Sequence, residues 1–198
     1  MSEILATTVE PTETGTDRYV VDGRSSRFTV RAFATGMLAA IGHNPTINIR
    51  GFSGEIKFDP EKLEAGSSKI IVKSSSLSVQ DDISAKDLRE MERLMNQGVL
   101  ETAKFREIFY ESSPVSLKKI ADMHYSAKLS GDLTLHGVSR NLPINVRVAV
   151  LGSMLRSSGD FSISQTDHDI KLISVAGGAL KLNDELKFSF EIVARRQE

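Results

Sequence analysis

The sequence of 198 residues contains no cysteine, no tryptophan and only five prolines. Without cysteine, the chain has no disulfide, no thiolate metal ligand and no thiol nucleophile. No segment approaches the roughly 18 consecutive apolar residues that a spanning helix requires, so we expect that this is not an integral membrane protein. The 25 basic and 26 acidic side chains nearly balance, and no basic excess indicates nucleic acid binding.

The standard catalytic signatures are also missing from the sequence. It has no Walker-type phosphate loop, no dinucleotide glycine fingerprint, no His-Glu-x-x-His and no nucleophile elbow. We therefore expect a protein that is not an enzyme and that has neither a catalytic residue nor a metal site.

The first residues differ in composition from the rest of the chain. Residues 1–17 are rich in Thr and Glu and have few large apolar groups, which predicts a flexible N-terminal tail followed by one domain over residues 18–198. This start lacks a basic segment followed by an apolar core, so it does not read as a signal peptide, and we expect a cytoplasmic protein.

From Arg18 onward, apolar and polar residues alternate with the period of a β-strand. The clearest case is Met123 to Leu135, where every second residue is apolar or small, and Asn141 to Val150 repeats the pattern. Further strands are expected around Phe28, Ile47, Ile56, Ile70 (continuing to Val79), Phe105–Tyr110, Phe161 and Phe188. About eight strands are expected, a number at which a closed antiparallel barrel has room for side chains or for one small ligand.

One segment follows the period of a helix instead. Between Ser84 and Gly98, the apolar residues Leu88, Met91 and Leu94 recur at spacings of three and four. Ser84 is a suitable N-cap, and Gly98 suits the left-handed position that ends a helix. The sequence therefore predicts one amphipathic helix lying against the barrel.

Four histidines are the first candidates for acid–base chemistry or metal binding: His43, His124, His136 and His168. On one extended strand, His124 and His136 would lie about 40 Å apart, too far to share an ion. His168 lies between Asp167 and Asp169, and only a turn would let these three side chains converge. We interpret that segment as a solvated connection, with a catalytic group as the alternative.

Two features leave the interior of the barrel undetermined. The apolar segment Thr35–Ile41 is either a plug that closes one end of the barrel or a mobile lip at a ligand entrance. The nine phenylalanines, mostly on predicted strands, either fill the core or line an apolar tunnel.

Several segments together resemble the YceI-like, polyisoprenoid-binding family. The resemblance is carried by residues 18–22 (RYVVD), 52–59 (FSGEIKFD) and, most specifically, 131–140 (GDLTLHGVSR), and it extends from about Arg18 to Arg195. It implies a lipocalin-like antiparallel barrel with a helical insertion, in which some members hold a polyisoprenoid chain. Many relatives are periplasmic, whereas this sequence shows no signal peptide.

These observations predict a barrel that binds, sequesters or transports one long-chain amphiphile, a polyisoprenoid or quinone-like lipid, without catalysis and with no cofactor besides that ligand. The partner is thus an apolar lipid, contact with membranes is transient, and a homodimer is left open. The predicted inward-facing contacts are Phe28, Val30, Ile56, Phe58, Leu133, Leu135, Phe161, Phe188 and Phe190. The predicted head-group contacts are His43, His136 and Arg140.

Two alternatives remain from the residues alone. The first is a hydrolase or isomerase of a small apolar substrate that uses His168 with Asp167 or Asp169, which requires these groups to converge on a cavity. The second is a packed barrel that acts as a protein-interaction module, which requires a filled interior and an exposed apolar patch.

Overall fold

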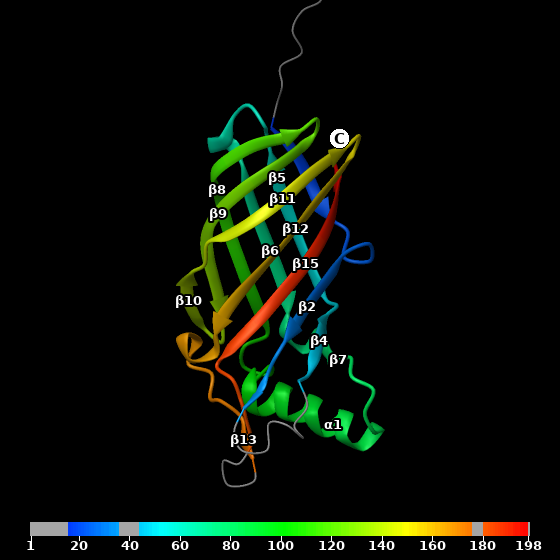
Figure 1. The fold of residues 1–198 in the computed structure, drawn as a ribbon, viewed down its shortest axis with the longest axis vertical. Helices are drawn as coiled ribbons and strands as arrows, with labels where there is room; N and C mark the ends of the chain where they lie inside the picture. The colour runs from blue at the N-terminus through cyan, green and yellow to red at the C-terminus, as the bar shows by residue number, and fades with distance from the viewer. Residues whose placement is uncertain (1–15, 36–43, 176–179, 198) are drawn as a thin grey trace, which may run out of the picture.

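The alternating segments pair into one antiparallel sheet that closes on itself (Figure 1). The computed structural model describes residues 16–35, 44–175 and 180–197. Going round the barrel, the order is β1, β5, β6, β8, β9, β11, β12 and β15, and a further pairing of β1 with β15 closes the ring. The predicted eight-stranded antiparallel barrel is therefore confirmed.

The barrel strands are β1 (Asp17–Val21), β2 (Arg27–Arg31), β4 (Thr46–Ile49), β5 (Phe52–Phe58), β6 (Ser67–Lys73), β7 (Leu77–Val79), β8 (Glu107–Ala121), β9 (His124–Leu135), β11 (Ile144–Leu151), β12 (Met154–Ser164) and β15 (Glu185–Arg196). The short strand β10 (Val138–Asn141) pairs with the end of β9. A separate small sheet consists of β3 (Ala34–Thr35), β13 (Ser174–Val175) and β14 (Leu180–Leu182).

Three of the eight barrel positions are filled by two consecutive short strands. β1 and β2 share one position, and both pair with β15. β5 and β4 share the next position, where β5 pairs with β1 and β4 pairs with β2. β6 and β7 share the third, where β6 pairs with β5 and β7 pairs with β4. The interruptions are the turn after Val21, the bend at Gly51 and the 3-10 turn η2 (Ser74–Ser76). The strand expected to run from Ile70 to Val79 is therefore two strands, because η2 turns the chain between them.

The alternation in the sequence corresponds to an inner and an outer face. Along β11, buried and exposed or half-buried residues alternate without exception from Ile144 to Leu151, and β9 shows the same pattern over most of its length. The boundaries are less accurate than the faces. Met123 lies in the turn before β9 with φ of 54°, and the strand expected over 141–150 is interrupted at Leu142 and Pro143 between β10 and β11.

Strand β8 is longer than expected. It runs from Glu107 to Ala121, whereas the sequence indicates a strand only as far as Tyr110. Its second half contains Pro114 and mixed polar residues, and its pairing with β9 shifts register after Pro114 and again after Lys119. These β-bulges disrupt the alternation by which a strand is recognised.

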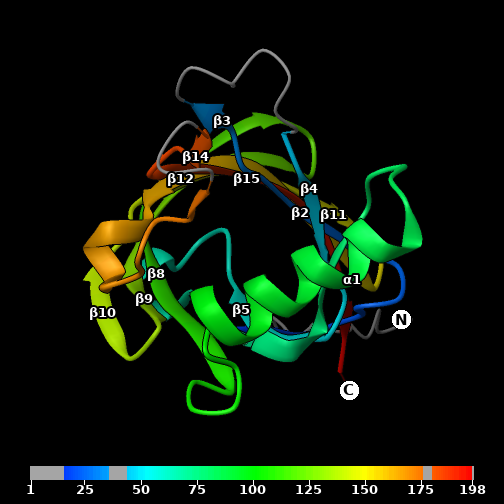
Figure 2. The same ribbon diagram turned by 90° about the horizontal axis from the view of Figure 1, so that it is seen from below.

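The predicted helix is confirmed and lies across one end of the barrel (Figure 2). Helix α1 (Ala85–Leu94) begins at Ser84, whose side-chain oxygen accepts a hydrogen bond from the backbone N–H of Asp87 at 3.1 Å. It continues as one π-helical turn, η3 (Met95–Val99), and the chain leaves it through Glu101 at φ of 44°. The expected left-handed position at Gly98 is therefore wrong, because Gly98 lies within η3.

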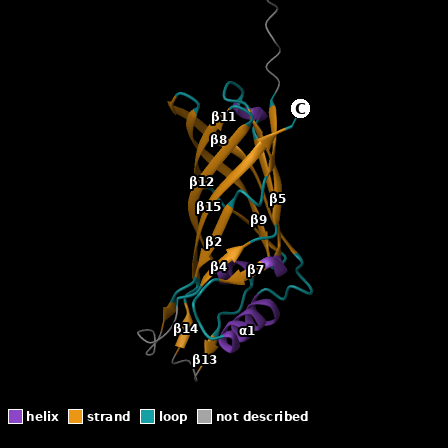
Figure 3. Ribbon diagram, turned by 90° about the vertical axis from the view of Figure 1, so that its right-hand side faces the viewer, coloured by secondary structure: helices purple, strands orange, loops and turns teal. Residues whose placement is uncertain are grey.

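The small β3–β14–β13 sheet lies at the same end as α1 (Figure 3). Two further 3-10 turns are η1 (Leu63–Ala65), which contacts β8, and η4 (Gln165–His168), which contacts β10. Most of the apolar segment predicted as plug or lip, and His43 with it, lies outside the described residues.

Candidate functional site

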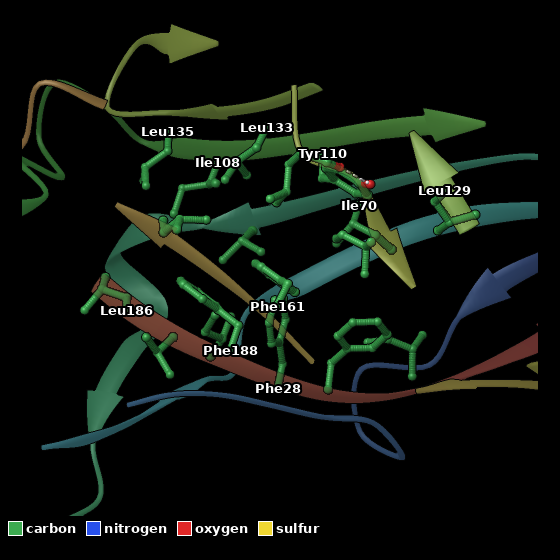
Figure 4. A pocket seen from close by; sticks show the side chains of 18 of the residues that line it. Phe28, Ile70, Ile108, Tyr110, Leu129, Leu133, Leu135, Phe161, Leu186 and Phe188 are labelled. Carbon is green, nitrogen blue, oxygen red and sulfur yellow. Dashed lines mark hydrogen bonds between the residues drawn. The ribbon is translucent and has the colours of Figure 1, made fainter. Parts of the chain in front are cut away.

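The barrel encloses an apolar cavity of about 430 Å³ (Figure 4). This volume falls in the range of roughly 300–1,000 Å³ that is typical of small-molecule sites. On β9 the lining extends from Ala127 to Leu135, and eight residue steps at about 3.3 Å correspond to a length of ~26 Å along the strand. That length is close to the ~30 Å hydrocarbon thickness of a lipid bilayer.

All nine apolar residues predicted to face inward lie in the wall of this one cavity. They come from β2, β5, β9, β12 and β15, and they are Phe28, Val30, Ile56, Phe58, Leu133, Leu135, Phe161, Phe188 and Phe190. The structure therefore brings them together around a common space. Their role as ligand contacts stays a prediction, because no ligand is present.

Phenylalanines from four strands form a cluster, and all of them except Phe52 line the cavity. The Phe28 ring meets the rings of Phe52, Phe161, Phe188 and Phe190 at centroid distances between 6.0 and 6.3 Å, all edge-on. Phe161 and Phe188 stack almost parallel at 4.7 Å. Such pairs hold aromatic rings in fixed orientations.

The clustered rings are not packed from all sides. Phe28, Phe161, Phe188 and Phe190 are only half-buried although they point into the barrel, whereas Leu155 on the same wall is fully buried. Large apolar side chains inside a closed barrel retain accessible surface only where they border a hollow. The filled interior that the packed-barrel alternative requires is therefore not observed.

Polar groups in the wall mostly bind other protein atoms. The Tyr110 hydroxyl donates to the Leu142 carbonyl at 2.9 Å, and the Gln165 side-chain amide donates to the Asn183 carbonyl at the same distance. Burial is the main cause that raises the pKa of Tyr110, so this phenol stays neutral. The middle of the cavity thus presents chiefly hydrocarbon to a ligand.

One end of the cavity is formed by the helix and the small sheet. Met91, Leu94 and Met95 line it from α1 and η3, and Leu182 and Lys181 line it from β14. Lys181 is also exposed, so the cavity approaches solvent beside it. Sequence reasoning missed Lys181, because nothing local distinguishes it from other strand lysines.

The opposite end is formed by η1 and the bulged part of β8. Leu63 and Gly66 line it from one side, and Pro114 and Leu117 from the other. Asp59 also lines this end, is buried, and accepts hydrogen bonds on Oδ1 from the backbone N–H groups of Glu61 and Lys62. Its Oδ2 has no hydrogen-bond partner among the described residues.

Two of the predicted head-group residues lie elsewhere. His136 is not in the cavity wall; its Nε2 lies 2.7 Å from Glu101 Oε2 and its ring packs on Phe105 at 4.2 Å. Arg140 is also outside the wall, and its Nε donates to the Asp167 carbonyl at 2.9 Å. Both side chains join β9 and β10 to the elements at the helix end of the barrel.

His168 is buried rather than solvated, so that interpretation is wrong. It is 2% exposed, its Nδ1 lies 3.0 Å from the Val138 carbonyl, and it is not among the cavity-lining residues. Asp167 and Asp169 are exposed, and Asp169 takes the left-handed position after η4. Within the described ranges, no three His, Asp or Glu side chains gather as a metal site would require.

Fold and site together define a class of protein: a closed antiparallel barrel that encloses one apolar cavity, as barrels that hold small ligands do. The chain belongs to the YceI-like domain family, whose model matches residues 19–194. No curated protein matches it. None of the described helices is long and apolar enough to cross a membrane.

Solved structures with the same fold share little sequence. BcnA of Burkholderia cenocepacia is 18% identical with a TM-score of 0.66, and the match covers 87% of this chain and 98% of BcnA. A polyisoprenoid binding domain from Saccharophagus degradans, implicated in plant cell wall breakdown, is 15% identical with a TM-score of 0.67, covering 90% and 98%. The YCEI protein of Campylobacter jejuni is 17% identical with a TM-score of 0.57, covering 77% and 85%.

Proposed function

We propose that this barrel binds the apolar tail of one polyisoprenoid or quinone-like lipid and carries or sequesters it without making or breaking a bond. The observation that supports this most is the hollow bordered by the half-buried Phe28, Phe161, Phe188 and Phe190. The name of the Saccharophagus domain, which has the same fold, is consistent with a ligand of this kind.

Removal of the tail from water supplies the binding energy. Each methylene that enters the cavity contributes about 0.8 kcal/mol, and association must first offset at least about 4 kcal/mol of lost freedom. A tail of many carbons therefore binds tightly, whereas a short one does not. The elongated cavity, ~26 Å along β9, suits a long linear chain better than a compact molecule.

Lys181 is the side chain that we assign to the head group. It is exposed at the helix end of the cavity while also lining it, so its ammonium can meet a polar or anionic group there. The tail then extends past the phenylalanines towards Leu63 and Leu117 at the other end.

The catalytic alternative receives no support from the geometry. It requires His168 to face the cavity with Asp167 or Asp169 beside it, but His168 is directed to the Val138 carbonyl and both aspartates are exposed. We therefore propose binding alone.

Mass spectrometry of an organic extract of the purified protein tests this proposal. We expect one lipid with a long apolar tail in stoichiometric amount. A filled variant, in which Ile108, Leu129 and Leu186 are all replaced by Phe, should contain much less of it, because all three side chains line the cavity and are half-buried.

The matched control replaces the exposed Ser126, Ser162 and Ser189 by Phe, which adds the same aromatic groups to the outer face of the barrel. This control should retain the wild-type lipid content. The reproducible absence of lipid from wild-type protein made in several hosts, or equal lipid in the filled variant, would contradict the proposal.

A further inference from the structure

The barrel end opposite α1 carries an unusual group of exposed apolar side chains. Five large apolar side chains are exposed in the described part of the protein, and three of them lie there; Val115 lies further back, at a bulge of β8 level with Lys128. These three form the tip patch: Ile120 (56% exposed) on β8, Met123 (41%) in the β8–β9 turn, and Leu151 (51%) at the end of β11.

The two hairpin ends that carry the tip patch are close in space. β8, β9, β11 and β12 are consecutive in the barrel, and both turns emerge at the end from which the C-terminus leaves (Figures 1 and 3). His124 pairs with Ala149, so Met123 and Leu151 project from neighbouring strand pairs at nearly the same level.

Positively charged side chains lie directly behind the tip patch on the outer wall. Lys118 pairs with Ser126, Ser126 pairs with Arg147, and Lys128 follows two residues further along β9, so these three cations share one face. All three are exposed and none forms an ion pair with another described residue. We call them the cationic row.

The spacing between the two groups matches a lipid interface. Arg147 precedes Leu151 by four residues and lies level with Lys118, which places these two cations about 13 Å behind the tip and Lys128 about 20 Å behind it. Apolar groups of peripheral proteins enter about 5–10 Å into the boundary between head groups and acyl chains, which leaves cations at this distance near the phosphates.

Acidic groups at this end differ between the two sides of the barrel: Glu61 and Glu64, around η1, are exposed and form no ion pair with a described residue, whereas those beside the tips have cationic partners. Asp122, between Ile120 and Met123, binds Lys119 Nζ at 3.2 Å, and Glu191 lies 3.7 Å from Arg156. β11 itself carries no acidic residue. On β8, β9 and β11, the unpaired charge nearest the tips is thus positive.

We propose that this end of the barrel docks peripherally on an anionic lipid bilayer, with the tip patch entering the interface and the cationic row binding lipid phosphates. An anionic surface of a second protein is a less suitable partner, because separate protruding apolar side chains fit a fluid lipid layer better than a rigid surface. The β8 hairpin that carries the tips also lines the cavity from inside with Pro114 and Leu117. Docking therefore places one end of the cavity against the membrane.

Sedimentation of the full chain with vesicles tests this inference. The wild type should bind vesicles of equimolar phosphatidylcholine and phosphatidylserine, bind pure phosphatidylcholine vesicles far more weakly, and dissociate as salt is added. Replacing Lys118, Lys128 and Arg147 together by Gln should lower partitioning about 100-fold, since each cation near an anionic surface is worth about fivefold.

Replacing Ile120, Met123 and Leu151 by Ser should lower partitioning at least tenfold, and the fold should survive because all three are exposed. The matched controls are Leu172→Ser, the fifth exposed apolar residue, and the triple Lys73→Gln, Lys86→Gln and Arg89→Gln, exposed cations elsewhere on the surface. Both should bind like the wild type.

Three results would overturn the proposal: no binding of the wild type to phosphatidylserine vesicles, equal loss in the controls, or a concentration-dependent dimer that the Ser variant abolishes. The last would identify the tip patch as an interface between two copies. The test is independent of the proposed lipid cargo, because lipid content reports on the cavity and sedimentation reports on the tips.

Discussion

Filling the cavity should make the lipid-free protein more stable, which is opposite to the result expected for a packed core. Replacing Ile108, Leu129 and Leu186 by Phe adds three carbons at each site, and all three side chains are half-buried and line the hollow. Three fully buried carbons would contribute up to about 2.4 kcal/mol per site. Incomplete contact and adjustment of side-chain rotamers reduce this to about 1 kcal/mol per site.

The triple variant should therefore gain about 3 kcal/mol in free energy of unfolding, or roughly 6–12 °C in melting temperature for a protein of this size. Affinity should change in the opposite direction. The nine added carbons occupy the space of about nine tail methylenes, which corresponds to about 7 kcal/mol and roughly 10⁵-fold weaker binding. The variant should thus be more stable than the wild type but bind the lipid more weakly.

The assay is thermal and urea unfolding of delipidated protein, followed by titration with a fluorescent apolar probe. In a packed interior, each substitution would cost about 1–3 kcal/mol through overpacking. A triple variant clearly less stable than the wild type would therefore refute the reasoning about the hollow. The triple Ser126→Phe, Ser162→Phe and Ser189→Phe controls for the added aromatic groups, since these positions are exposed.

Three further predictions concern the frame around the cavity. Burial, and next the Asp17 carboxylate, raise the pKa of the Tyr19 hydroxyl to about 12, so between about pH 10 and pH 12 the unfolded chain loses this proton while the folded chain keeps it. The free energy of unfolding should therefore fall as the pH rises through that window, and it should fall less in Tyr19→Phe. Equal slopes for the two proteins in denaturation series at different pH would contradict this. Ser84→Ala removes the α1 N-cap and should speed hydrogen exchange in α1, at a cost of about 1 kcal/mol, without changing exchange in β11. Gly131→Ala should be severely destabilising, because a Cβ there would lie 2.3 Å from the Glu111 carbonyl oxygen. Gly98→Ala should instead stabilise the protein by about 0.5–1 kcal/mol, because a Cβ there would meet no atom within 4 Å. Similar melting temperatures for the two variants would be inconsistent with these contacts.

The inward and outward faces could be predicted because a strand has a strict period of two. The assignment of Phe161, Phe188 and Phe190 to the cavity needed only the alternation within β12 and β15. The same reasoning failed where the backbone leaves that period. Pro114 introduces a bulge into β8, so Leu117 faces the cavity from a stretch that shows no alternation.

The head-group residues could not be predicted, for a different reason. His136 and Arg140 are polar residues next to an inward-facing run, but adjacent strand residues point to opposite faces. Leu135 lines the cavity, so His136 is directed outward to Glu101 and Phe105. Lys181, which does line the cavity, lies on the middle strand of the small three-stranded sheet, whose strand β3 comes from a distant part of the sequence.

Whether the barrel is hollow also depends on a quantity that no local pattern contains. The radius of a barrel follows from strand number and stagger, and an eight-stranded barrel lies at the limit where side chains just fill the interior. Here Phe28 meets four other phenylalanines by their edges and still leaves ring surface uncovered. Because bulges bend a strand and increase its twist, we infer that the register shifts of β8 help to keep the wall apart. The same apolar residues in a more regular barrel of this size would interdigitate and leave no room for a tail. Regularising β8 by deleting one bulge residue should therefore shrink the cavity and reduce lipid content even though every lining side chain is retained.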